Sequence, residues 1–219
     1  MDYLIDVHDT SRKRDLGYRK KIIESLSCDF GTLGGPQVEP PQHWERDRWF
    51  LPTLKSVGMH LQELSTEGGR ACEYFFHILA NPADEISLWL AGKVLSDPTR
   101  SWERHLEDSV EELYRITRKE IRDELARIFL DAEQAYFRHL PARMSGTISM
   151  EPLVSDKPGL PIYLSRRLSP KQRATYASEM TGIKARAEKL LPEIPQRSKP
   201  KMERVVQCLS NVLNDAGGA

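Results

Sequence analysis

The chain has 219 residues, of which 39% are hydrophobic and 29% charged, and its formal net charge is zero. This length suits one domain, or one domain with an extension, and the modest hydrophobic share leaves much of the chain at the surface. The longest apolar stretch, residues 86–95, is interrupted by Ser87, Gly92 and Lys93 and is too short for a membrane-spanning helix, which needs roughly 18 residues.

The cysteines and the first residues bear on location. Cys28, Cys72 and Cys208 are widely spaced and odd in number, which argues against a disulfide framework and for a reducing compartment. Residues 1–6 are acidic and lack the basic and apolar regions of a secretory signal. We therefore expect a cytoplasmic protein without a membrane span, with the nucleus as an alternative location.

Charge is distributed unevenly along the chain. Residues 31–97 carry a net charge of −4, residues 98–140 carry −2, and residues 141–219 carry +6. Such asymmetry is typical of a protein with an acidic partner, and it also arises when a basic tail pairs with an acidic middle of the same chain.

The chain begins with a short unit, residues 1–30, followed by a Gly/Pro-rich linker at 31–42. The centre of the first unit is basic, which suits nuclear import or phosphate contact, although a solvated charged face is the simpler explanation. Together with the basic tail, it supplies the candidate polyanion-binding residues, which are Arg12, Lys13, Arg14, Arg19, Lys20, Lys21, Arg197, Lys199 and Lys201.

Residues 43–191 are predicted to form a helical core domain. A helical pattern covers residues 44–64, where Pro52 either starts the helix or breaks it, and Gly68-Gly69 separates it from a second pattern at 70–79. Asn81-Pro82 then predicts a helix start, with an N-cap residue followed by proline at the first helical position.

Aromatic residues crowd the start of this domain. Trp44, Trp49 and Phe50 lie in a stretch rich in arginine and acidic residues, a mixture that protein-interface hot spots favour. They are candidate interface residues, and the alternative is that Trp49, Phe50 and Leu54 form the core-facing side of this helix.

Residues 98–140 give the longest helical pattern, opened by Asp97-Pro98. A straight helix of this length would span about 65 Å, whereas a compact chain of 219 residues is about 45 Å across. The helix must therefore break, protrude or be covered by a second copy, and we expect a protruding helix or a homodimer. Its apolar or neutral stripe has an average spacing near 3.6, typical of a helix lying on a globular core, and consists of Leu106, Val110, Leu113, Thr117, Ile121, Leu125, Ile128, Ala132 and Ala135.

The pattern changes after this helix. Several prolines exclude helix from residues 146–164, where we expect an irregular or β-like segment. Ser169 and Gln172 form a capping-box signature that opens a helix to residue 191. Further prolines then predict a hinge, so that residues 192–219 form a hinged C-terminal helix that docks on its own core or in a partner's groove.

The sequence carries no phosphate-binding loop, dinucleotide fingerprint, HExxH, GxSxG or CxxC motif. Glu73 and His77 lie one helical turn apart, and Glu120, Glu124 and Asp131 share a helix face. Such groups are common on helices, so hydrogen bonds and a salt-bridged surface explain them better than a metal site does. We expect no cofactor, no bound metal and no enzymatic activity.

These patterns predict a mainly α protein, a multi-helix bundle with one long helix. The function we expect is that of a non-enzymatic helical interaction protein, an adaptor, assembly or regulatory factor that binds another protein. The alternative is a nucleic-acid-binding accessory or packaging protein that uses its two basic clusters.

Overall fold

The computed structural model describes residues 50, 52–66, 68, 81–139 and 169–217, and every structural statement below concerns these residues. Within them the fold is mainly α, as predicted, with no strand. The predicted unit 1–30, the linker 31–42, the helix at 70–79 and the β-like segment at 146–164 lie outside the described residues. The helices are α2 (Leu54–Thr66), α3 (Pro82–Ser96), α4 (Trp102–Tyr114), α5 (Lys119–His139), α7 (Pro170–Leu190) and α8 (Lys199–Gly217).

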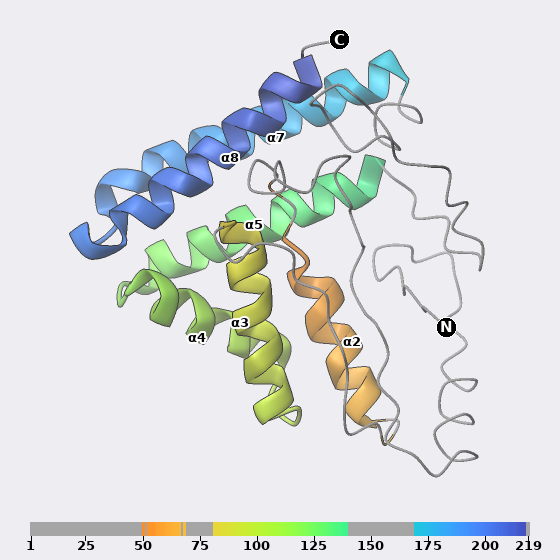
Figure 1. Ribbon diagram of the computed structural model, residues 1–219, viewed down its shortest axis with the longest axis vertical. Helices are drawn as coiled ribbons and strands as arrows, with labels where there is room; N and C mark the ends of the chain where they lie inside the picture. The colour runs from red at the N-terminus through yellow and green to blue at the C-terminus, as the bar shows by residue number, and fades with distance from the viewer. Residues whose placement is uncertain (1–49, 51, 67, 69–80, 140–168, 218–219) are drawn as a thin grey trace.

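The long helix α5 lies at the centre of the bundle. It packs against α2 and α4 on one side and against α7 on the other (Figure 1). Helices α7 and α8 run side by side as a hairpin, and α3 contacts α2, α4 and α8. All six helices contribute to one hydrophobic core, whose fully buried side chains include Leu54, Leu90, Leu125, Met180 and Leu209.

The prediction of one helix over residues 98–140 is wrong, because the chain turns after Tyr114. Arg115 has φ 54° and ψ 38°, the left-handed conformation that ends helices, and α5 begins at Lys119. Of the nine predicted stripe positions, Thr117 is exposed in this break, whereas the other eight are buried. The break lets both halves pack on one core, so neither a protrusion nor a second copy is needed to accommodate the length.

The start of this region also differs from the prediction. Ser101, not Asp97, is the N-cap of α4. Asp97 instead ends α3, and its carboxylate accepts hydrogen bonds from the Thr99 hydroxyl at 2.6 Å and the Thr99 N–H at 3.2 Å. An aspartate that binds its own turn in this way favours a turn over a helix.

Helix α2 begins at Leu54, after Pro52, and not at residue 44, whereas three other boundaries agree with the sequence signals. The Asn81 side chain accepts a hydrogen bond from the N–H of Ala83 and caps α3. Ser169 and Gln172 make both hydrogen bonds of a capping box at the start of α7. Gly68, after α2, has a φ of 89°, which suits a residue without a side chain.

The N-terminus of α2 is capped by other helices. Glu133 of α5 is fully buried, and its carboxylate accepts a hydrogen bond of 2.8 Å from the N–H of Lys55. The hydroxyl of Ser87 in α3, also buried, accepts one of 3.1 Å from the N–H of Thr53. Two N–H groups at the start of α2 thus take their partners from distant parts of the sequence.

Helices α2 and α4 approach closely where Gly58 faces Trp102. A Cβ atom at Gly58 would lie 2.6 Å from the Cβ of Trp102, well inside van der Waals contact. Glycine at this position therefore sets the separation of the two helices.

The predicted hinge between α7 and α8 consists of two short 3-10 turns, η2 (Leu191–Glu193) and η3 (Gln196–Ser198). Ile194 and Ser198 are buried there, and the apolar side of α8 docks on the chain's own core. Among the described residues no helix is long and apolar enough to cross a membrane.

Candidate protein-binding surface

Helix α3 carries hydrophobic residues on two opposite sides. Ala83, Ile86, Leu90 and Val94 are buried in the core, at helical spacing. The opposite side carries Leu88, Trp89 and Leu95, whose exposed fractions are 37%, 44% and 51%. These three are the exposed large hydrophobic residues of the described chain, and all of them belong to one helix.

Gly92 lies between these exposed side chains on the helix surface. It follows Leu88 by four residues and precedes Leu95 by three, and a Cβ atom there would meet no atom within 4 Å. Helix formation alone disfavours glycine, which costs about 1 kcal/mol relative to alanine inside a helix. Its effect here is a low point in the surface between Leu88, Trp89 and Leu95. We call these four residues the α3 face.

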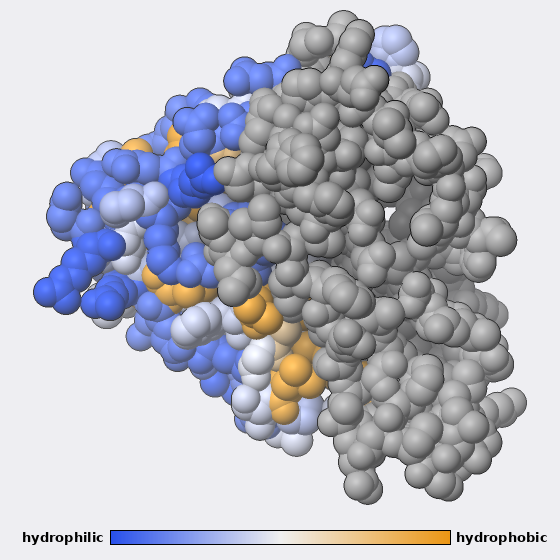
Figure 2. Space-filling model, in the orientation of Figure 1, coloured by the Kyte–Doolittle hydropathy of each residue, from blue (hydrophilic) through white to orange (hydrophobic). Residues whose placement is uncertain are grey.

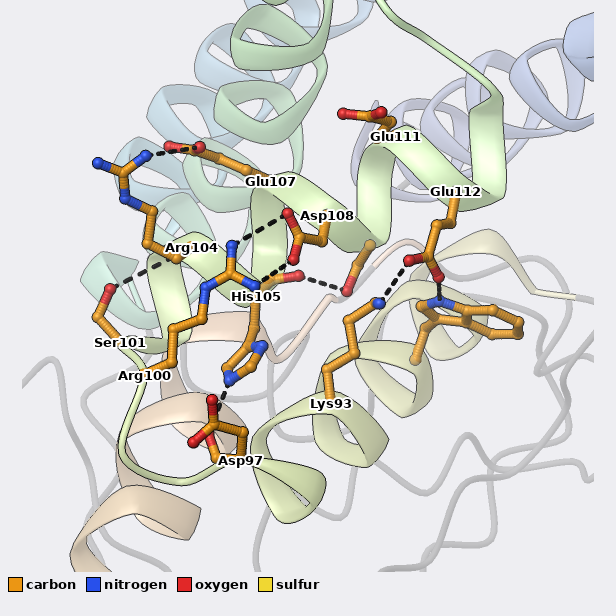
Figure 3. A network of polar contacts seen from close by, with 12 residues as sticks. Lys93, Asp97, Arg100, Ser101, Arg104, His105, Glu107, Asp108, Glu111 and Glu112 are labelled. Carbon is orange, nitrogen blue, oxygen red and sulfur yellow. Dashed lines mark hydrogen bonds and ion pairs between the residues drawn. The ribbon is translucent and has the colours of Figure 1, made fainter.

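The indole of Trp89 is held in place by Glu112 of α4 (Figure 3). Its Nε1–H donates a hydrogen bond of 3.1 Å to Oε2 of Glu112, while Nζ of Lys93 donates one of 2.7 Å to Oε1 of the same carboxylate. The hydrogen bond from Lys93, and then that from Trp89, holds the pKa of Glu112 below its ordinary value. An exposed tryptophan fixed in this way loses little side-chain freedom when a partner binds.

The turn between α3 and α4 is also well connected (Figure 3). The Arg100 guanidinium donates two hydrogen bonds to Asp108, which raise the pKa of Arg100. The His105 ring is buried, with Nε2 2.8 Å from the carbonyl oxygen of Asp97. From α2, the Gln62 amide donates a hydrogen bond of 2.7 Å to the carbonyl oxygen of Arg100. The turn that follows α3 is therefore held to α4 and α2 by hydrogen bonds.

The helices that form and flank the α3 face are acidic. Residues 82–114, which form α3, α4 and their turn, carry eight Asp/Glu against three Lys/Arg, a net charge of −5. In Figure 2, hydrophobic surface is visible where Figure 1 places α3, with hydrophilic surface beside it. Of these carboxylates, Glu112 contacts Trp89 directly, Glu85 precedes Trp89 by about one helical turn, and Asp97 follows the last residue of α3.

The predicted interface residues are only partly described. Trp44 and Trp49 lie outside the described residues. Phe50 is 2% exposed, and its ring stacks on Phe129 of α5 with a centroid distance of 5.4 Å. For Phe50 the core-facing alternative is therefore correct.

The predicted polyanion-binding residues are divided in the same way. The six between Arg12 and Lys21 lie outside the described residues. Arg197 is exposed in η3, and Lys199 is half-buried at the start of α8. Lys201 forms an ion pair with Glu85 of α3, as expected if the basic tail pairs with the acidic middle.

The acidic side of α5 is the salt-bridged surface that the sequence favoured over a metal site. Glu124 and Asp131 both bind the guanidinium of Arg186 in α7, with 2.7 Å between Nε and Glu124 Oε1. These contacts raise the pKa of Arg186. In the described part of the chain, no group of three or more His, Cys, Asp or Glu side chains could hold a metal ion.

Sequence reasoning did not identify the α3 face. The sequence does carry a signal for it, because residues 86–95 are the longest apolar stretch of the chain and are too short to span a membrane. A short helix that is apolar on both sides has more hydrophobic surface than one core contact covers.

Neither a known protein family, nor a curated protein, nor a solved structure matches this chain.

Proposed function

We propose that this chain is a non-enzymatic adaptor, assembly or regulatory factor that works by binding another protein through the α3 face. The observation that carries the proposal is the clustering of Leu88, Trp89 and Leu95 on the exposed side of one helix. Scattered exposed hydrophobic residues are normal on protein surfaces, whereas a cluster of large ones on one element marks an interaction surface.

The position of Trp89 supports the same proposal. Tryptophan is enriched among the residues that dominate binding energy, particularly when it is central and surrounded by other contacts. Here Leu88, Gly92 and Leu95 are its neighbours on the helix, and Glu112 fixes its ring. A partner would gain apolar contact area without having to order this side chain first.

The test compares the proteins that associate with two forms of the full chain in the cells that produce it. The double variant Leu88→Ser, Leu95→Ser removes the two aliphatic side chains of the α3 face. Because both side chains are exposed, the variant should keep the fold. We expect proteins cross-linked to the wild type to be lost from this variant. Retention of the same proteins would contradict the proposal.

The matched control places the same number of serines on another exposed helix surface. Ala174 and Ala185 of α7 are both exposed, and their separation of about three helical turns puts them on the same side of the helix. The double variant Ala174→Ser, Ala185→Ser should keep the wild-type partners. Circular dichroism and thermal unfolding of both variants would establish that each is folded.

Nucleic-acid binding is a second candidate, favoured by the exposed Arg197 and the adjacent Lys199 at the turn between α7 and α8. The variant Arg197→Glu, Lys199→Glu leaves the ion pair of Lys201 with Glu85 intact. If this turn contacts phosphates, fluorescence anisotropy with short labelled DNA and RNA will show weaker binding and a flatter salt dependence for the variant. Equal affinities would remove this turn from the candidate site.

A further inference from the structure

We propose that the partner segment bound by the α3 face is a basic amphipathic helix. This inference rests on the proposed function and names the chemical class of the partner. The bound helix would place apolar side chains against Leu88, Trp89 and Leu95, over Gly92, and its Lys and Arg residues toward the surrounding carboxylates.

The shape of the face fits a helix. Leu88, Trp89, Gly92 and Leu95 span seven positions, about two turns of α3, which is the length covered by the i to i+7 anchors of an amphipathic helix. The absent side chain at Gly92 leaves room for a large anchor between its neighbours. Within the described residues there is no strand whose edge could receive an extended peptide.

The charge around the face decides between a basic partner and a second copy of this chain. Residues 82–114 have a net charge of −5, and the Lys201 and Arg122 side chains that pair with Glu85 and Glu111 reduce it to −3, so two copies joined across their α3 faces would still bring two acidic surfaces together. Like charges across an interface oppose association, and opposite charges speed it and select the partner. The surroundings of the α3 face therefore favour a basic segment.

The basic residues nearest the face are already engaged with acidic ones. Lys93 pairs with Glu112, Arg100 with Asp108, and Lys201 with Glu85. Asp97 adds further negative charge at the C-terminal end of α3. These four carboxylates outnumber the three basic groups, and a carboxylate accepts from more than one donor at once, as Glu112 does.

The probes are three labelled synthetic peptides of about 18 residues, roughly five helical turns. The first has leucines at i, i+3, i+4 and i+7 with lysines elsewhere; the second replaces the lysines with glutamates; the third has the composition of the first in a scrambled order without an apolar side. Using fluorescence anisotropy with the full chain, we expect the first peptide to bind at least about tenfold more tightly than either of the others. Equal binding of the first and scrambled peptides, or of the first and acidic peptides, would overturn the inference.

A pair of glycine variants localises the binding. Gly92 in α3 and Gly182 in α7 are both exposed helical glycines with open space around the missing side chain. Gly92→Gln and Gly182→Gln should both fold, since glutamine forms helices better than glycine. We expect Gly92→Gln to weaken binding of the basic peptide by at least about tenfold and Gly182→Gln to leave it unchanged. An unchanged affinity for Gly92→Gln would overturn the placement on α3.

The remaining outcomes separate this inference from the proposed function. If cross-linked partners depend on Leu88 and Leu95 but the basic peptide does not bind, the partner class is wrong and protein binding through the α3 face stands. If sedimentation shows a concentration-dependent dimer that Gly92→Gln abolishes, the occupant is a second copy and the inference fails. If changes at the α3 face alter neither the set of cross-linked partners nor the affinity for the basic peptide, both proposals fail.

Discussion

Helices α3 and α7 are built in similar ways, yet they present different surfaces. Each has a side-chain N-cap, proline in its first turn and a glycine on its exposed side. The exposed residues of α7 are small, polar or charged, and include Lys171, Ala174, Ser178, Thr181, Gly182, Ala185, Glu188 and Lys189. The exposed side of α3 carries Leu88, Trp89 and Leu95. The difference shows that α3 has more hydrophobic surface than the core requires, and this excess is where a binding function is to be sought.

The buried sides of the two helices should be equally sensitive to truncation. Leu90 in α3 and Met180 in α7 are both fully buried. Leu90→Ala and Met180→Ala should each lower the free energy of unfolding by about 2–5 kcal/mol, because each leaves a cavity in the core. Urea denaturation measures the loss. A small effect for Leu90→Ala alone would indicate that α3 is not part of the common core.

The glycines should respond according to their surroundings. Gly92→Ala and Gly182→Ala should each raise the free energy of unfolding by about 0.5–1 kcal/mol, because alanine favours the helix and meets no neighbour. Gly58→Ala should lower it by about 1–2 kcal/mol, because the new Cβ overlaps Trp102 and the strain exceeds the gain in helix propensity. Thermal unfolding of the three variants tests both signs, and a stabilising Gly58→Ala would contradict the close packing of α2 on α4.

Helix α7 has no counterpart of Trp89. The carboxylate of Glu112 that holds the Trp89 indole can be altered partly or removed completely. Glu112→Gln keeps an oxygen that accepts from the Trp89 indole but loses the charge that binds Lys93, whereas Glu112→Ala loses both. We expect acrylamide quenching of Trp89 fluorescence to rise in the order wild type, Glu112→Gln, Glu112→Ala. Trp89→Phe gives the background from the other tryptophans. Identical quenching in all forms would mean that Glu112 does not hold the ring.

The smallest expected effect is on the pH dependence of stability. The pKa of Glu112 lies below its ordinary 4.5 in the folded chain, first because of Lys93 and then because of Trp89. A lowered folded-state pKa gives stability that is present above pH 4.5 and is lost as the pH falls through the folded value. Since the Glu112 side chain is half exposed, the contribution is below about 1 kcal/mol. The difference in unfolding free energy between wild type and Glu112→Gln should therefore shrink at acidic pH.

Much of the local structure could be predicted from the sequence. Asn81, Ser169 and Gln172 act through neighbours close in the chain, so their capping roles follow from residue type and position. Asp97 shows the limit of such reasoning, because Asn81 before Pro82 starts α3, whereas Asp97 before Pro98 ends it and does not start α4. The break at Arg115 has no glycine or proline to signal it, and tertiary packing of the two halves on one core decides it.

The candidate site was less predictable than the fold. A periodic pattern gives one side of a helix, but which side of α3 is covered depends on how α2, α4 and α8 are placed around it. The contact of Trp89 with Glu112 joins residues 23 positions apart, and that of Lys201 with Glu85 joins residues 116 apart. Such pairs emerge only from the tertiary arrangement.

The capping of α2 by Glu133 and Ser87 has a consequence for the order of folding. The contact between Glu133 and Lys55 spans 78 residues, and that between Ser87 and Thr53 spans 34, so neither exists until α3 and α5 stand beside α2. Helices α3 and α7, with caps from their own sequence, can begin to form as local units. The first turn of α2 takes its hydrogen-bond partners from chain segments that are synthesised after it. We therefore expect this turn to form late on the folding pathway.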